Sequence, residues 1–135
     1  DILSVMKKGE HSSTFGGNPL ACAAGTATLH ALTQDGLIEN AKSIGEKFSN
    51  GLEELKSKHP IIREVRGKGL MIGVELKFEV KDILMEGIKN GLLLLYSGRN
   101  ILRFLPPLVI SEEDTVKTLQ ILDELLTNEE NRRNA

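Results

Sequence analysis

Residues 61–76 read IIREVRGKGLMIGVEL, and this stretch decides the fold. From Leu70 to Leu76 apolar residues alternate with other residues, which is the period-two pattern of a strand with one buried face. The apolar residues at 61–65 predict a preceding strand, and residues 66–69 contain the two glycines of a turn. The stretch therefore predicts two strands joined by a glycine turn.

Two helices are predicted upstream of these strands. The nearer one ends at His59-Pro60 and carries its Glu and Lys side chains on a solvent-exposed face. Its apolar residues recur every three or four positions, the period of one helical face, at Leu37, Ala41, Ile44, Phe48, Leu52 and Leu55. Asn18-Pro19 is a start signal for an earlier helix that runs to about Leu32. Its small residues predict close packing, with Cys22 packed and without a redox role.

Three shorter elements and a final helix are predicted downstream. Residues 82–90 form a helix, residues 92–96 a buried strand, and residues 101–104 a strand ended by two prolines, which cannot donate to a sheet ladder. The last helix opens at Ser111, which with Asp114 forms a variant of the capping box. Its inner face is predicted at Val116, Leu119, Leu122 and Leu126, and residues 131–134 look like a polar tail.

The order of these elements favours one class of fold. Two helices, two strands, a helix, two strands and a helix predict an α+β fold, in which helices cover one face of a small, largely antiparallel sheet.

Composition excludes several classes of function. The 135 residues fit one compact domain, and 17 Lys and Arg against 19 Asp and Glu give a formal charge of -2. With no basic block and 4% aromatic residues, we expect no nucleic-acid binding. No apolar stretch reaches the length of a membrane span, so we expect a cytoplasmic protein without membrane contact. Cys22 is the single cysteine, and the three histidines, expected at a surface or interface, lie too far apart to predict a metal site.

The residues before the first helix suit an anion. Residues 11–19, HSSTFGGNP, place hydroxyls and glycines ahead of a helix N-terminus, where free N–H groups and the positive end of the helix dipole favour negative charge. A phosphate fits such a place. The same residue types also collect before helices as caps and turns, so composition alone leaves both interpretations open.

Three blocks of the chain resemble class III aminotransferases, especially acetylornithine and ornithine aminotransferases. HSSTFGGNPLACAAGTATLHAL (11–32) is similar to the segment after the catalytic lysine, and VRGKGLMIGVEL (65–76) and GLLLLYSGRNILRFLPPLVIS (91–111) are similar to two later blocks. The resemblance implies the C-terminal portion of a fold-type I transferase that depends on pyridoxal 5'-phosphate. Residues 1–34 would end the large cofactor-binding domain and its interdomain segment, and residues 35–135 would form the C-terminal small domain.

The resemblance also implies site residues. In relatives the Thr of STFGGNP binds the cofactor phosphate across the dimer interface and the preceding Ser lies beside the substrate, so these roles fall on Thr14 and Ser13. The usual family form has Gly where this chain has Ser12, whose side chain restricts the turn without removing either donor. Arg103 of ILRFLPPL would hold a substrate carboxylate, which the rigid donor fork of a guanidinium matches.

Other positions typical of the family are assigned to structure. The glycines of residues 66–69 are explained by a turn, and Arg66 fits an ion pair with a carboxylate. Lys7 and Lys8 could supply the amine that such a mechanism needs, yet the family's lysine lies upstream of the region corresponding to Asp1. Both lysines are therefore expected in solvent, and no catalytic residue is expected in this chain.

The resemblance implies an activity for the parent enzyme, not for this chain alone. It would move the terminal amino group of N-acetylornithine, or a related diamino acid, to 2-oxoglutarate and form glutamate, in arginine or lysine biosynthesis. The active sites would be shared in a homodimer. Ornithine, succinylornithine, acyl-lysine and 4-aminobutyrate remain open as donors. So do two other classes: a free-standing α+β module that binds a regulatory amino acid, and a fragment that only packs or dimerises.

Overall fold

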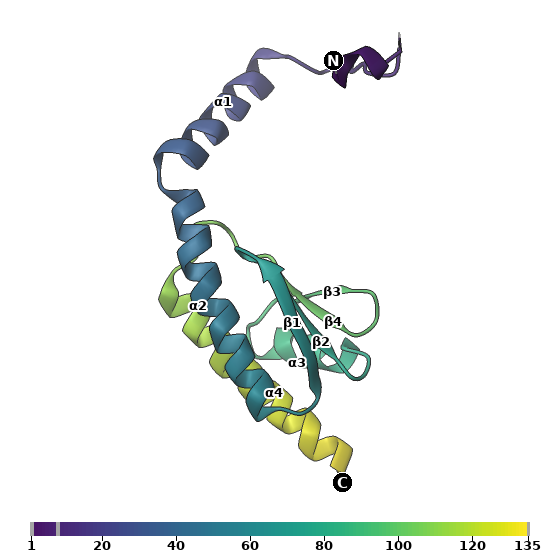
Figure 1. Cartoon of the computed structure of the whole chain (residues 1–135), viewed down its shortest axis with the longest axis vertical. Helices are drawn as coiled ribbons and strands as arrows, with labels where there is room; N and C mark the ends of the chain where they lie inside the picture. The colour runs from purple at the N-terminus through teal and green to yellow at the C-terminus, as the bar shows by residue number, and fades with distance from the viewer. Residues whose placement is uncertain (1, 8, 135) are drawn as a thin grey trace. The chain divides into compact units, whose positions relative to one another are not determined.

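The computed structural model describes residues 2–7 and 9–134, and the chain forms two compact units that divide between Gly36 and Leu37. The first unit holds a 3-10 turn and one α-helix, and the second holds the remaining elements (Figure 1). In chain order the elements of the described residues are η1 Ile2–Val5, α1 Pro19–Gln34, α2 Leu37–Lys58, β1 Ile62–Lys68, β2 Met71–Leu76, α3 Lys81–Lys89, β3 Leu95–Ser97, β4 Ile101–Phe104 and α4 Glu112–Asn134.

The second unit is built on a four-stranded antiparallel sheet in the order β1-β2-β4-β3. The hairpin of β1 and β2 occupies one side, and β4 pairs with β2 on its inner edge and with β3 on its outer edge. Helices α2 and α4 lie side by side along the sheet, and α3 contacts α4 (Figure 1). The predicted α+β fold with a small antiparallel sheet is confirmed.

The alternation of side chains along each strand decides which residues enter the core. Ile72, Val74 and Leu76 of β2 are buried, whereas Met71 on the opposite face is 63% exposed. From the helical side, α2 buries the predicted positions Ile44, Phe48, Leu52 and Leu55. The Phe48 and Phe104 rings meet edge to face, with centroids 5.2 Å apart, a favoured geometry for aromatic pairs. The opposite face of the sheet, which includes Met71 and Arg103, lies outside this core and is here called the open face.

Two glycines allow α2 to contact the β1–β2 turn backbone to backbone. A Cβ on Gly45 would lie 2.4 Å from the carbonyl oxygen of Gly69 and 2.5 Å from its carbonyl carbon. Gly69 itself has φ +56°, a left-handed conformation that side chains disfavour. A Cβ on Gly67 would lie 2.3 Å from the carbonyl oxygen of Met71. The structural role predicted for the glycines of residues 66–69 is therefore confirmed.

His59 is buried, so the prediction of a surface or interface position was wrong for this residue. Its exposed fraction is 2%, and it lies directly after α2. Nε2 is 2.6 Å from Asp123 Oδ1 and Nδ1 is 2.9 Å from Glu130 Oε2, and Lys58 also pairs with Asp123. The end of α2 is therefore tied to α4 by an ion-pair cluster of His59, Lys58, Asp123 and Glu130.

Three further predictions about local structure were wrong. The buried strand at residues 92–96 is instead β3, Leu95–Ser97, and all three of its residues are exposed. Val116 is 47% exposed, because the inner face of α4 is turned to bury Leu125 with Leu122 and Leu126. Residues 131–134 are helical and not a tail, since Arg132 and Arg133 bind the buried carboxylate of Glu129. The capping box at the start of α4 is confirmed, because Ser111 Oγ accepts from the Asp114 N–H at 3.1 Å.

We expect Gly45→Ala to destabilise the chain by about 1 to 3 kcal/mol, because the neighbouring backbone cannot move aside as a side chain can. Gly51→Ala is the matched control on the same helix, since its Cβ would meet only the flexible end of Leu119. Both variants gain the same helix propensity, about 1 kcal/mol. Urea denaturation followed by circular dichroism measures the difference. Equal stability of the two variants would contradict the backbone contact.

The Asp123 cluster predicts a stability that falls at low pH. Hydrogen bonds from Lys58 and then His59 lower the pKa of Asp123 below its usual 3.8. A lowered pKa contributes stability that is present above the unfolded-state pKa and is lost as the pH falls through the folded-state pKa. We therefore expect wild type to lose its advantage over Asp123→Asn as the pH is lowered from about 5 to about 2. Urea titration at each pH measures the free energy of unfolding. Glu124→Gln removes an exposed neighbouring carboxylate on α4 and is the control, because it should leave the loss of stability at low pH unchanged.

Candidate functional site

The turn before α1 is held by the side chain of Asn18. Its Oδ1 accepts from the Ala21 N–H at 2.9 Å, and its Nδ2 donates to the carbonyl oxygen of Phe15 at 2.7 Å. Gly17 between them has φ +71°, which glycine adopts without strain. The predicted helix start at Asn18-Pro19 is therefore confirmed, and one side chain fixes the turn onto the helix.

Ser13 and Thr14 precede this turn with exposed hydroxyls. No described residue forms a hydrogen bond with either hydroxyl. The helix end itself offers few free donors, since Pro19 has no N–H and Asn18 occupies the N–H of Ala21. An anion placed before α1 would therefore be bound by these hydroxyls more than by the helix terminus.

The helix after the turn has no buried residue among those described. The close packing expected for its small residues is therefore not found within the described part of the chain, and Cys22 is exposed and not packed. Lys7 is exposed as predicted, and so are His11 and His30. Lys8 and Asp1, which entered the argument about the lysine, lie outside the described residues.

Arg103 belongs to the second unit and lies on β4 between two core residues. Leu102 and Phe104 are buried, so the alternation of the strand places Arg103 on the open face, where it is exposed. Within residues 2–7 and 9–134 no carboxylate pairs with its guanidinium. Its five donors are therefore open to an external anion.

Arg66 of β1 lies on the same open face, but its guanidinium is paired with carboxylates. Its Nη1 donates to Glu64 Oε2 at 2.6 Å and to Glu75 Oε2 at 2.8 Å. The hydrogen bond from Arg66 lowers the pKa of Glu75, and the same bond raises the pKa of Arg66. The ion pair predicted for Arg66 is present. Glu75 was not singled out from the sequence, although the hairpin register places it beside Glu64.

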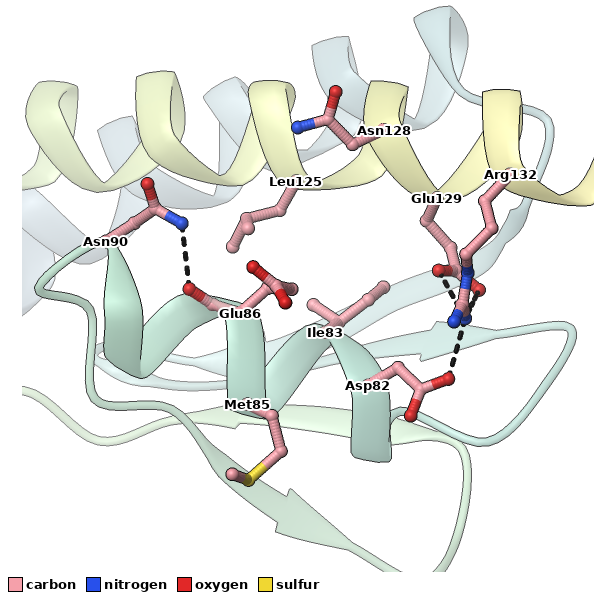
Figure 2. Close-up of a pocket in the computed structure, with 9 residues that line it drawn as sticks. All are labelled: Asp82, Ile83, Met85, Glu86, Asn90, Leu125, Asn128, Glu129 and Arg132. Atoms are coloured by element: carbon pink, nitrogen blue, oxygen red, sulfur yellow. Dashed lines mark hydrogen bonds and ion pairs between the residues drawn. The ribbon is translucent and has the colours of Figure 1, made fainter.

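The charged residues that line the hollow between α3 and α4 are all held in ion pairs. It measures about 320 Å³, and Asp82, Glu86, Glu129 and Arg132 line it together with Asn90 (Figure 2). Nη2 of Arg132 donates to Asp82 Oδ2 at 2.7 Å and to Glu129 Oε1 at 2.9 Å, and the bond from Arg132 lowers the pKa of Asp82. The polar groups of this hollow join α3 to α4, and none of the predicted site residues lines it.

Two other kinds of site are absent from the described part of the chain. Among the described residues, no group of three or more His, Cys, Asp and Glu side chains is arranged to hold a metal ion. Among the described helices, none combines the length and apolarity that crossing a membrane requires.

The chain belongs to the class-III aminotransferase family, whose model (Aminotransferase class-III) matches residues 1–126. It is 48% identical over 125 residues to the acetylornithine aminotransferase of Caldanaerobacter subterraneus subsp. tengcongensis, and the match covers 92% of this chain and 32% of that protein. It is 40% identical over 126 residues to ornithine aminotransferase 1 of Staphylococcus saprophyticus, covering 93% of this chain and 32% of that protein. The chain thus spans about a third of the length of these relatives.

Solved structures give the same result. The acetylornithine aminotransferase of Elizabethkingia anophelis superposes with a TM-score of 0.85 at 36% identity, covering 94% of this chain and 33% of that one. The ornithine δ-aminotransferase of Plasmodium falciparum superposes with a TM-score of 0.83 at 36% identity, covering 93% and 33%. The resemblance to this family is therefore confirmed, and it favours an aminotransferase over a free-standing regulatory module.

Proposed function

We propose that this chain is the C-terminal part of an aminotransferase that moves the terminal amino group of N-acetylornithine, or a related diamino acid, to 2-oxoglutarate and forms glutamate. The observation that carries the proposal is the 48% identity to an acetylornithine aminotransferase across 92% of the chain. Because the match covers 125 residues, it extends over both units and includes the positions of Thr14 and Arg103. Ornithine is the second candidate donor, because several relatives are ornithine aminotransferases at 40–44% identity.

The residues before α1 fit the phosphate of pyridoxal 5'-phosphate. Thr14 and Ser13 offer exposed hydroxyl donors on a turn that Asn18 and Gly17 hold in place. Hydrogen bonds to a charged acceptor are about twice as strong as neutral ones. In this proposal Thr14 holds the cofactor phosphate in a pocket shared with a second subunit, and Ser13 lines the substrate side of that pocket. When bound, the cofactor supplies the electron sink of the reaction, and the protein supplies orientation.

Arg103 is the residue of this chain proposed to bind the substrate carboxylate. Its unpaired guanidinium on the open face suits a substrate carboxylate, which it can bind through two parallel hydrogen bonds. Such a pair orients the substrate, since both carboxylate oxygens are fixed at once. The lysine, the acid facing the cofactor ring nitrogen and the stacking aromatic are assigned to the part of the protein beyond this chain, in keeping with the family resemblance.

The activity test uses the intact protein to which the chain belongs and follows glutamate formation in a coupled assay. We expect kcat/KM with N-acetylornithine to exceed that with 4-aminobutyrate by about 10-fold or more, as differences in pocket contacts give. The 135-residue chain by itself is expected to show no turnover. Turnover by the isolated chain, or a preference for 4-aminobutyrate, would contradict the proposal.

Thr14→Ala should weaken cofactor binding by about 10- to 100-fold, because one hydrogen bond to a charged phosphate oxygen is lost. Thr14→Ser keeps the hydroxyl and should stay within about threefold of wild type. Thr33→Ala is the control, since its hydroxyl bonds to the Leu29 carbonyl oxygen of its own helix. Absorbance titration of the apo form of the intact protein with pyridoxal 5'-phosphate measures the affinity without any turnover. Equal affinities for wild type and Thr14→Ala would refute the phosphate role.

A further inference from the structure

A row of paired residues crosses the open face of the sheet at Arg103. Arg66 of β1 pairs with Gly73 of β2, and Gly73 pairs with Arg103 of β4. Residues directly opposite each other in antiparallel strands carry their side chains on the same face. Two arginines therefore flank a position that has no side chain.

Gly73 forms part of the floor of a hollow on this face. The hollow measures about 330 Å³ and is lined by Arg66, Gly73 and Arg103, with Met71 and Ile101 as apolar walls. A Cβ on Gly73 would lie 3.3 Å from Ile101 Cγ2 and 3.8 Å from the Arg66 carbonyl oxygen. A methyl group therefore fits if Ile101 shifts by a few tenths of an ångström, whereas a larger side chain would occupy the hollow.

The two arginines differ in how their charges are compensated. Glu64 and Glu75 both accept from Nη1 of Arg66 and neutralise its charge on this face. In the described residues no such carboxylate faces Arg103. A carboxylate that enters the hollow is therefore drawn to Arg103, and Gly73 is the residue directly beside it.

Arg103 also lines a second hollow. It measures about 290 Å³, and its other walls include the leucines of residues 92–95 and the prolines at 106 and 107. Gly73 does not line this second hollow. Substitutions at position 73 therefore test the open-face hollow alone.

We propose that Gly73 is a specificity-determining residue, which keeps space beside Arg103 for the group attached to a substrate carboxylate. The inference rests on the proposed function, in which Arg103 binds that carboxylate. A side chain larger than a methyl group at position 73 would exclude a long substrate such as 2-oxoglutarate. It would affect a short 2-oxo acid such as pyruvate less, because pyruvate adds only a methyl group beyond its keto carbon.

The test compares Gly73→Ala and Gly73→Val in the intact protein loaded with cofactor. We expect Gly73→Val to raise KM for 2-oxoglutarate about 10-fold or more, with kcat within about threefold, since the loss affects binding more than the chemical step. Gly73→Ala should stay within about threefold for both constants. The ratio of kcat/KM for 2-oxoglutarate to that for pyruvate should fall in Gly73→Val. Thermal melting and cofactor titration check that both variants fold. If Gly73→Val does not fold, Gly73→Ala shows whether position 73 tolerates a side chain.

A double-mutant cycle with Arg103→Ala separates this inference from the proposed function. If Gly73 acts beside Arg103, Gly73→Val should add less than about twofold to KM once Arg103 is removed. A raised KM in Arg103→Ala with an unchanged KM in Gly73→Val overturns the inference and leaves the proposed function in place. An unchanged KM in Arg103→Ala overturns the role of Arg103, and the inference with it.

Discussion

The second unit depends on the close contact between α2 and the β1–β2 hairpin. Gly45 lets the helix backbone approach Gly69, and this approach brings Phe48 against Phe104 and buries Leu52 completely. Interiors packed to this density do not deform continuously, because each side chain fills the space its neighbours leave. The hairpin, the central strand β4 and the helix therefore share one arrangement, and a shift of any of them disrupts the others.

The same core also fixes the position of Arg103, and no additional contact to Arg103 is needed for this. Leu102 and Phe104 face the helices, so the residue between them must face away. A slip of β4 by one residue would turn the guanidinium into the core and expose two large apolar side chains. Such a slip is too costly to compete, since burying an unpaired charge costs several kcal/mol. Placement of the cation is thus a by-product of burying its neighbours.

Features that local geometry determines could be predicted from the sequence, and features that need distant partners could not. The alternation of β2 and the caps at Asn18 and Ser111 follow from backbone geometry. The leucines at 92–95 look buried in the sequence, but their burial depends on which layer covers them, and no local pattern encodes that layer. His59 is buried because its ring contacts Asp123 and Glu130, which lie 64 and 71 positions further along the chain. The site was harder to predict, since hydroxyls before a helix also serve as caps and in turns, and only the family resemblance distinguished Thr14.

The strand order leaves β1 and β3 at the two edges of the sheet, where unpaired backbone groups invite pairing with strands of other molecules. β3 is only three residues long. β1 has an irregularity between Ile62 and Glu64 and carries charged side chains at Arg63, Glu64, Arg66 and Lys68. Bulges, charges and short strands all oppose edge-to-edge association. The folded sheet is therefore protected against edge-to-edge pairing with other copies of the chain.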